Sequence, residues 1–206
     1  MDTRTARPLT MRQRKKAQTR EKVLSAARQS FIDRGYLRAT IRDIATLAGM
    51  STGAFFASFP SKEACLEAII AEEHEEEFQL FEATKSVSRI PTETIRGMLA
   101  LSYARWSKER GLLRAWMTQY WVGHQDLEAL TRAYERRTID TLKHILVQAE
   151  LHDVGRLAGV ITSLHMDNLR YLGVDTNGDT TFPETRLGVQ LELLITHGQH
   201  LGPGCA

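Results

Sequence analysis

The residues best suited to chemistry are short polar side chains and cations gathered between positions 40 and 62. They are Thr40, Arg42, Ser51, Thr52, Gly53 and Lys62. Hydroxyl, guanidinium and ammonium groups donate hydrogen bonds to phosphate oxygens, and hydroxyls also reach the edges of bases. A glycine among them lets the backbone approach another molecule closely. This segment is therefore expected to bind a polyanion such as a nucleic acid.

Two short helices are predicted to position these side chains. Their apolar positions are Ile41, Ile44, Ala45 and Ala48 in the first helix, then Ala54, Phe55 and Phe59 in the second. Gly49 ends the first helix, and Thr40 and Ser51 are good N-caps because each hydroxyl can accept an otherwise unpaired amide. Asp43, three residues after Thr40, resembles the second half of a capping box. Two helices joined by a tight turn form a helix-turn-helix, whose second helix enters the DNA major groove.

Charge is distributed unevenly along the chain. Residues 1–58 contain twelve lysines and arginines against four acidic residues, an excess of eight positive charges. The whole chain carries a net charge of +2, so residues 59–206 carry a net charge of −6. A basic end attached to an acidic body is typical of a protein that binds a polyanion through that end.

The same segment resembles the DNA-binding domain of the tetracycline-repressor (TetR/AcrR) family of bacterial transcription regulators. The family pattern reads T-x-x-x-I-A-x-x-A-G-[VM]-S-x-G-x-x-Y-x-H-F-x-[SN]-K. It is matched here by Thr40, Ile44, Ala45, Ala48, Gly49, Ser51, Gly53, Phe59, Ser61 and Lys62. Phe56 stands where the family usually has tyrosine, and Ser58 stands where it often has histidine. The resemblance covers roughly residues 20–70, and many positions agree at fixed spacing.

The resemblance implies which side chains meet DNA. The expected DNA-binding residues are Thr40, Arg42, Ser51, Thr52, Gly53, Ala54, Phe56 and Lys62. Thr52, Gly53 and Ala54 would face the base edges from the start of the second helix. Thr40, Phe56 and Lys62 would lie on the sugar-phosphate backbone, where Phe56 lacks the hydroxyl that a tyrosine would direct to a phosphate. Residues 1–18 are expected to have no fixed structure without DNA, and the stretch 12–20 to follow phosphates or enter a minor groove.

The chain as a whole is predicted to be all-α. Helices are expected near residues 19–34, 61–87, 91–109, 112–122, 125–150, 153–172 and 184–197, in addition to the two helices of the motif. This gives a three-helix head over residues 1–60, joined by a long helix to a helical body within residues 61–206. The acidic run from Glu72 to Glu77 in the long helix is expected to be a solvated face.

Composition limits the class of protein further. Hydrophobic residues make up 42% of 206 residues, which is enough to bury a core. Because no run of about 18 apolar residues occurs, we expect no membrane span. No apolar segment follows the basic N-terminus, so we expect no secretory signal. The two cysteines, Cys65 and Cys205, lie far apart, which favours a reduced, cytoplasmic protein.

Catalytic and metal-binding patterns receive no support. Asp175, Asn177 and Asp179 imitate the start of a calcium loop, but Thr180 and Arg186 stand where glycine and a bidentate glutamate are needed. A pair of histidines, His197 and His200, lacks a third ligand nearby and is interpreted as part of a fraying helix end. Zinc-protease, phosphate-loop and nucleophile-elbow motifs are absent from the sequence, so we expect neither an enzyme nor a cofactor or metal site.

Aromatic residues gather in the middle of the chain, where all three tryptophans fall between positions 103 and 121. Core packing is the simple explanation for any one of them. As a group they also suit a small-molecule pocket, which is apolar with a few polar contacts. The family resemblance, which places an effector in this region, favours the pocket. The predicted effector-binding residues are Tyr103, Trp106, Trp116, Met117, Tyr120, Trp121, His165, Asn168 and Tyr171.

The last two predicted helices carry apolar residues at helical spacing. Intramolecular packing would account for them, whereas the family resemblance implies that both helices meet their copies in a four-helix dimer interface. The residues predicted for this interface are Leu157, Ile161, Leu164, Leu187, Leu191, Leu194 and Ile195.

Together these features predict a ligand-responsive homodimeric transcriptional regulator. It would act as a repressor that binds a palindromic operator in double-stranded DNA and is released by a small, mostly apolar effector. Two alternatives remain: a DNA-binding regulator or activator without a ligand, and an enzyme that has kept a vestigial head.

Overall fold

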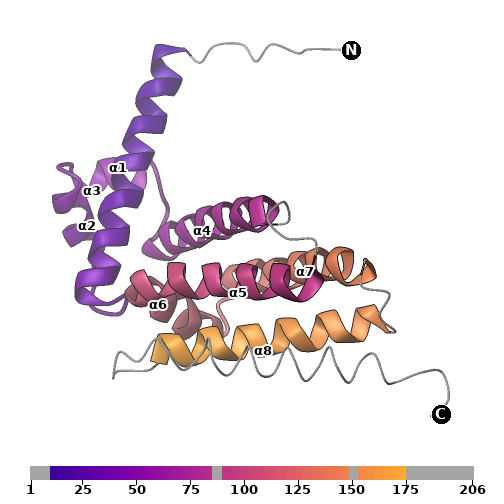
Figure 1. Ribbon diagram of the computed structural model, residues 1–206. Coiled ribbons are helices and arrows are strands. Elements are labelled where there is room, and N and C mark those ends of the chain that lie inside the picture. Colours follow the sequence, from indigo (N-terminus) through magenta and orange to yellow (C-terminus); the bar gives the residue numbers. More distant parts are fainter. Residues whose placement is uncertain (1–9, 85–89, 149–152, 175–206) are drawn as a thin grey trace. The chain divides into compact units, whose positions relative to one another are not determined.

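The computed structural model describes residues 10–84, 90–148 and 153–174, and the regular elements in these ranges are all α-helices (Figure 1). They are α1 Met11–Arg34, α2 Ile41–Leu47, α3 Thr52–Phe56, α4 Lys62–Thr84, α5 Pro91–Lys108, α6 Arg110–Trp121, α7 Gln125–Val147 and α8 Val154–Val174. The prediction of an all-α chain is confirmed for this part of the chain. None of these helices is both long enough and apolar enough to cross a membrane.

The chain divides into two compact units, Met1–Ile69 and Ile70–Ala206, called here the head and the body. The head holds α1, α2, α3 and the first residues of α4, and the body holds the rest of α4 with α5 to α8. The expected helix at 184–197, the loop with Asp175, and Cys205 lie outside the described residues.

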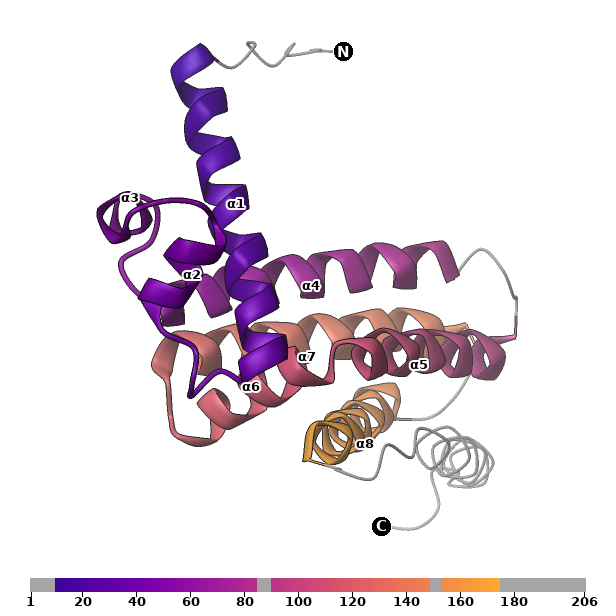
Figure 2. The same ribbon diagram turned by 90° about the vertical axis from the view of Figure 1, so that its left-hand side faces the viewer.

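Helix α1 begins eight residues earlier than predicted, at Met11 rather than Thr19. The reason is a capping box: the Thr10 hydroxyl accepts the Gln13 amide at 3.3 Å, and the Thr10 amide donates to Gln13 Oε1 at 2.8 Å. The expectation that residues 11–18 have no fixed structure is therefore wrong. Within the head, this first half of α1 extends past α2 and α3 (Figure 2).

The turn between α2 and α3 is fixed by backbone hydrogen bonds around Gly49. The Gly49 amide donates to the Thr46 carbonyl at 3.0 Å, and the Met50 amide donates to the Ala45 carbonyl at 2.9 Å. This pair of bonds requires a positive φ at the residue that ends the helix, and Gly49 has a φ of 68°. The turn presents α3 while Phe55, completely buried, anchors it to the head core.

The acidic run in α4 is not a solvated face, contrary to the prediction. Glu73, His74 and Glu77 are 3%, 5% and 0% exposed, whereas Glu75 and Glu76 face the solvent. The buried residues recur at spacings of three and four with Ile70 and Phe81, so they lie on the apolar face of the helix. Tertiary packing therefore divides the run into buried and exposed acids.

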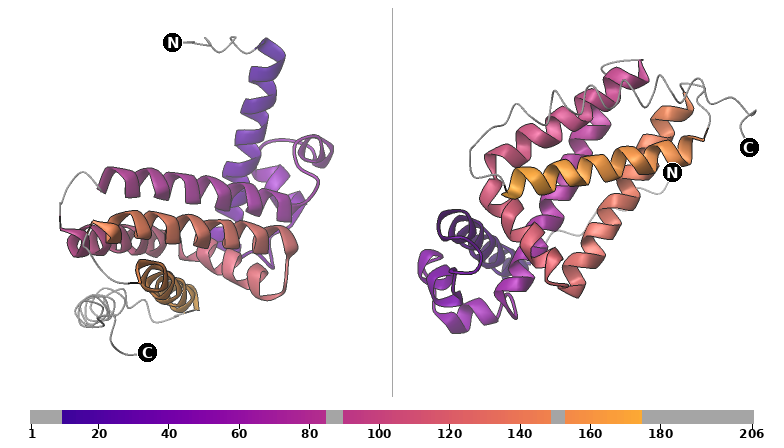
Figure 3. Two further views of the ribbon diagram at one scale, coloured as in Figure 1. Left: turned by 90° about the vertical axis from the view of Figure 1, so that its right-hand side faces the viewer. Right: turned by 90° about the horizontal axis from the view of Figure 1, so that it is seen from below.

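The body is held by packing among its later helices. Helix α8 packs against α6 and α7, and α5 packs against α7 and α8 (Figure 3). Each of these helices contributes a completely buried aliphatic residue to the core: Ile95 from α5, Leu112 from α6, Leu142 from α7 and Leu169 from α8. These contacts bring α4, α5, α7 and α8 side chains together around the site described below.

Candidate DNA-binding head and a buried polar cluster in the body

The head exposes most of the predicted DNA-binding residues. Exposed positions are Thr40, Arg42, Ser51, Thr52, Gly53 and Phe56, and half-buried positions are Ala54 and Lys62. Thr52 and Gly53 begin α3, and the Ser51 hydroxyl caps that helix by accepting the Ala54 amide at 3.2 Å. Phe56 is 54% exposed, and its ring stands edge-on to Phe55 with centroids 5.5 Å apart. The start of α3 therefore offers an accessible surface on a rigid support.

Thr40 uses its hydroxyl to build α2. It accepts the Asp43 amide at 3.1 Å and donates to the Asp43 carboxylate at 2.6 Å. Arg34 holds the same carboxylate at 3.0 Å. Hydrogen bonds from Thr40, with nearby Arg34 and Arg42, hold the pKa of Asp43 below its usual range. Thr40 thus positions the motif through local bonds.

Lys62, for which a phosphate contact is predicted, makes bonds within the head. Its Nζ donates to the carbonyls of Tyr36 and Ala39 at 3.0 and 3.1 Å and lies 4.4 Å from the Tyr36 ring centre. The Tyr36 hydroxyl in turn donates to Glu63 at 2.8 Å. These bonds tie the start of α4 to the loop between α1 and α2, so the Lys62 ammonium is already engaged.

Gly49 and Gly53 serve the motif for different reasons. Gly49 needs its positive φ, although nothing lies within 4 Å of a Cβ built there. Gly53 has ordinary helical geometry, and a Cβ there would meet only the Ser51 hydroxyl at 3.8 Å. The fold of the head therefore does not require glycine at 53.

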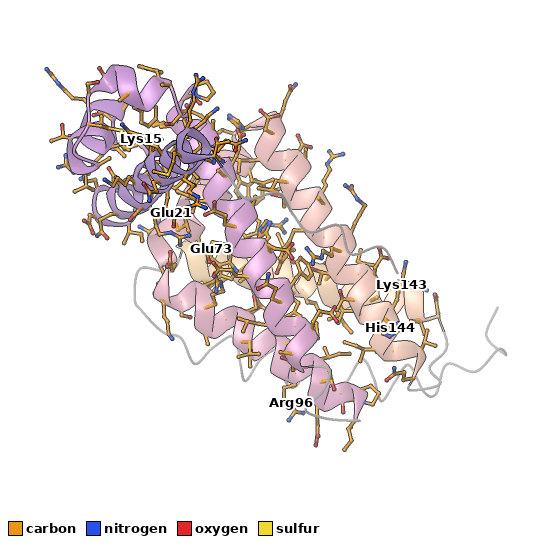
Figure 4. The ribbon with its side chains drawn as sticks, turned by 90° about the horizontal axis from the view of Figure 1, so that it is seen from above. Lys15, Glu21, Glu73, Arg96, Lys143 and His144 are labelled. Atoms are coloured by element: carbon orange, nitrogen blue, oxygen red, sulfur yellow. The ribbon has the colours of Figure 1, made fainter. Side chains whose placement is uncertain are left out.

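Helix α1 carries a dense set of cations on its free half. Arg12, Arg14, Lys15, Lys16 and Arg20 are all exposed, and Glu21 is the first acidic residue of the helix. Lys15 and Glu21 can be followed on α1 in Figure 4. The predicted basic arm is therefore a preformed helix over residues 11–20, whose fixed spacing can match a row of phosphates.

In the body, part of the predicted effector set forms one buried group of rings. Trp106 and Trp116 are completely buried, with ring centroids 5.2 Å apart. The Trp116 indole donates to Thr131 at 2.9 Å. His74 lies between Trp116 and Tyr134, with centroid distances of 4.6 and 4.3 Å. The rings contact one another directly, as in a packed core.

Polar groups are buried beside these rings. His165 Nε2 lies 3.0 Å from the Tyr134 hydroxyl and 3.4 Å from the Ser102 hydroxyl. The Trp106 indole donates to Glu77 Oε2 at 3.3 Å. Burial raises the pKa of Glu77 to about 7, against hydrogen bonds from Ser102, Trp106 and Tyr134 that lower it. Burial also lowers the pKa of His74 to about 3 and that of His165 to about 4, so both imidazoles are neutral at pH 7.

Other predicted effector residues lie apart from this group. Trp121 and Tyr171 are 69% and 48% exposed, and Tyr120 is half-buried. Tyr120 and Trp121 form a surface pair, with the Arg170 guanidinium 5.9 and 5.7 Å from their ring centres. Trp121 and Tyr171 therefore lie outside the buried ring group. Tyr103, Met117, His165 and Asn168 are buried, and Tyr103 lies 5.8 Å from the His165 ring.

Two surface pockets are lined by residues that do not belong to the buried ring group. One lies on the head between α1 and α2 and is lined by Glu21, Lys22, Ser25, Ala26, Gln29, Leu47 and Ala48. Another follows α7 and is lined by Ala133, Arg136, Arg137, Asp140, Thr141 and His144. Neither of the two contains a residue of the buried ring group.

Comparison with known proteins identifies the head. Residues 23–69 match the family model described as bacterial regulatory proteins, tetR family. The chain is 34% identical over 73 residues to the HTH-type transcriptional regulator TtgR of Pseudomonas putida, which is 35% of each chain. It is 30% identical over 87 residues, 42% of each chain, to the HTH-type transcriptional repressor KstR2 of Mycolicibacterium smegmatis. Residues 23–69 therefore form a DNA-binding domain of the TetR type. These matches span well under half of the curated relatives' lengths.

Solved structures extend the likeness of fold to the body. A transcriptional regulator from Rhodococcus sp. has a TM-score of 0.74 at 17% identity, covering 89% of this chain and 99% of that one. FadR of Thermus thermophilus, a TetR-family repressor in complex with lauroyl-CoA, has a TM-score of 0.65 at 21% identity, covering 91% and 98%. At these identities the likeness shows a common fold, so the TetR architecture of head and body is shared.

Helix α8 carries three of the residues predicted for the dimer interface. Leu157 and Ile161 are 8% and 0% exposed and pack inside the body, while Leu164 is half-buried. The opposite face of α8 is exposed. It carries Arg156, Val160, Ser163, Asp167, Tyr171 and Val174 at spacings of three and four. The other predicted interface residues, Leu187, Leu191, Leu194 and Ile195, lie outside the described residues.

Sequence reasoning missed Glu77 and Tyr134 as members of the buried cluster. The signal for Glu77 was its spacing, because it falls on the same helical face as Ile70, His74 and Phe81. A run of acids on every side of the helix obscured that spacing. Tyr134 gave no separate signal, since it lies on α7, far in sequence from the tryptophans.

Proposed function

We propose that this chain is a ligand-responsive homodimeric transcriptional repressor that binds a palindromic operator and is released by a small, mostly apolar effector. The observation that carries the proposal is the exposed start of α3 on a basic head. There Thr52 and Gly53 are accessible, and the capping bonds of Thr40 and Ser51 hold both helices. A preformed, exposed helix start beside cations suits the reading of base edges in a major groove.

Phosphate binding would come from the free half of α1 and from Arg42. The five exposed cations between residues 11 and 20 lie on one helix without an acid among them. Their contribution would be independent of sequence, because phosphate contacts position a protein on DNA and base contacts specify the site. Each head would occupy half of the operator, with half-site centres about 34–36 Å apart.

Two heads on two half-sites require a dimer of the chain. The exposed face of α8 is a candidate surface for its interface. Val160, Tyr171 and Val174 are 38%, 48% and 72% exposed on that face. Exposed apolar side chains among polar ones on a helix face are compatible with a surface that a second helix covers. In this proposal the α8 part of the interface is the face that carries Val160, Tyr171 and Val174, because Leu157 and Ile161 are buried in the body.

The ligand-responsive part of the proposal rests on the buried polar cluster of the body. The Thermus thermophilus FadR, which shares this fold, is a repressor in complex with lauroyl-CoA. A repressor of this fold can therefore bind a ligand with a long apolar part. An effector acts only if it binds the DNA-competent and the DNA-incompetent states with different affinity.

One observation favours a second candidate, a regulator without a ligand. Trp106 and Trp116 contact each other and are completely buried, as expected of a solid core. A filled body would leave the heads unregulated, so this candidate predicts DNA binding that small molecules do not change.

The experiment uses the purified full chain and labelled duplexes from the regions flanking its own gene. Fluorescence anisotropy at about 150 mM salt should find one fragment bound roughly 1,000-fold or more tightly than a scrambled duplex of equal length. Thr52→Ala should weaken that specific binding and leave binding to the scrambled duplex unchanged. Equal affinity for all fragments would overturn the proposal. A small-molecule screen on the bound complex then separates the two candidates.

A further inference from the structure

Two buried acids on α4 differ in their partners. Glu73 and Glu77 are 3% and 0% exposed. Glu73 is ion-paired with Arg105, which also binds Glu76 at 2.6 Å. Glu77 has no ion pair of its own among the described residues, although hydrogen bonds from Ser102, Trp106 and Tyr134 and the charge of Arg105 act to lower its pKa. Its Oε2 accepts the Trp106 indole at 3.3 Å, and its Oε1 has no hydrogen-bond partner in this part of the chain. Glu77 is therefore a buried carboxyl group that forms no salt bridge within the described part of the chain.

Further polar atoms beside Glu77 also lack partners in the described part of the chain. They are His74 Nε2 and His165 Nδ1, and both residues are buried. Ring contacts join them, since His74 lies 4.3 Å from Tyr134, and His165 lies 6.3 Å from Tyr134 and 5.8 Å from Tyr103. Native cores pair nearly all buried polar groups, so several unpaired atoms in one cluster indicate a missing partner.

The surroundings determine the chemistry of that partner. A carboxylate in a low-dielectric site is stabilised by a positive charge that also donates a hydrogen bond. The neutral imidazoles of His74 and His165 cannot supply the charge, and Arg105 binds Glu73 and Glu76. The electron-rich faces of Trp106, Trp116 and Tyr134 attract a cation as well. An anionic ligand would instead meet Glu77 as a like charge.

We propose that the cluster binds the protonated nitrogen of a lipophilic amine, with the Glu77 carboxylate as its anchor. This inference rests on the proposed function, because it names the class of effector that the body would recognise. The amine donates to Glu77 Oε1, and its apolar part lies among the rings of Trp106 and Trp116. Because these rings now touch, the ligand enters by parting them.

The test compares two probes of equal length, 4-phenylbutylamine and 4-phenylbutan-1-ol, at pH 8.5. At this pH the amine is protonated and Glu77 is ionised. Binding to the full chain without DNA is followed by tryptophan fluorescence in a Trp121→Phe background. That background removes the exposed indole and leaves the two buried ones. The amine should bind roughly tenfold or more tightly than the alcohol.

Two matched variants assign the preference to Glu77. Glu77→Gln should bring the amine and the alcohol to similar affinity. Glu75→Gln removes the same charge from the exposed face of the same helix and should keep the preference. Equal affinity of the two probes in the parent protein, or a preference that survives in Glu77→Gln, would overturn the inference. Calorimetry repeats the comparison with a signal that does not depend on the indoles.

A separate arm distinguishes this inference from the proposed function. Anisotropy with the operator duplex measures whether the amine releases DNA. Amine-selective binding that leaves operator affinity unchanged would support the site and contradict its role as an effector site. Operator release by other compounds, without any amine preference, would support the proposed function and contradict the site.

Discussion

The head exposes its polar chemistry, whereas the body buries it. Thr52, Gly53 and the cations of α1 lie at the surface, and short-range bonds set their geometry. Glu77, Tyr134 and His165 lie in the core, where residues distant in sequence must meet. The difference suits two kinds of partner. DNA is large and charged and meets an open surface, while a small ligand is recognised by enclosure and desolvation.

The largest effect is expected from a test of whether the head binds DNA through the cations on the surface of α1. Replacing Arg12, Lys15 and Lys16 by glutamine keeps helix propensity but removes three charges. Operator affinity at physiological salt should fall roughly 100-fold, and the slope of log affinity against log salt should decrease by about 2–3, because fewer counterions are released. Anisotropy across a salt series measures both quantities.

The control removes three charges from the body instead. Arg132, Arg136 and Lys143 on α7 are exposed, and Lys143 is labelled in Figure 4. Changing them to glutamine should leave the salt dependence nearly unchanged. An equal loss in both variants would mean that net charge, rather than the α1 surface, governs binding.

The next largest effect is expected on the free energy of unfolding, which depends on the charge state of the buried Glu77. Its pKa is raised to about 7 in the folded protein, so the stability from its protonated form is present at low pH and is lost as pH rises through 7. Glu77→Gln mimics the neutral acid. It should therefore raise the free energy of unfolding by about 2–3 kcal/mol at pH 8.5 and by much less at pH 5. Urea unfolding at both pH values measures this, and a destabilised variant at pH 8.5 would mean that a cation already pairs with the carboxylate.

A smaller effect separates the two glycines of the motif. Gly53→Ala should fold with normal or slightly higher stability, because a Cβ there meets only the Ser51 hydroxyl at 3.8 Å. It should still weaken operator binding roughly tenfold, about 1.4 kcal/mol, by blocking close approach. Gly49→Ala should instead cost about 1 kcal/mol of stability, since its φ is 68°. Thermal unfolding and anisotropy on both variants test whether Gly53 affects binding and Gly49 affects stability. Unchanged operator binding by Gly53→Ala would mean that Gly53 does not lie in the DNA interface.

The smallest effect concerns Phe56, which is 54% exposed beside Phe55. If its ring lies on the sugar-phosphate backbone, Phe56→Tyr should add a phosphate hydrogen bond of about 0.5–1.5 kcal/mol. Specific and nonspecific DNA should gain equally, because phosphates carry no sequence information. A loss of affinity, or an altered base preference, would place the ring in the groove.

The sequence by itself determined the features that depend on near neighbours. Thr40 with Asp43, Gly49, and Ser51 with Ala54 define caps and a turn within a few residues, so type and spacing were sufficient for the helix-turn-helix. The same local reasoning could have found the capping box of Thr10 and Gln13, and it would have corrected the start of α1. Helix identity along the body followed from apolar periodicity alone.

Only the tertiary structure decided which polar residues meet in the body. Glu75 and Glu77 have the same chemistry and lie two residues apart, yet one faces solvent and the other is completely buried. Trp116 and Trp121 differ in the same way. Burial depends on which helices cover each face, and that is set by contacts between segments such as α4, α5 and α7. The chemistry of the buried cluster therefore arises from long-range packing, because desolvation, not residue type, gives Glu77 its raised pKa.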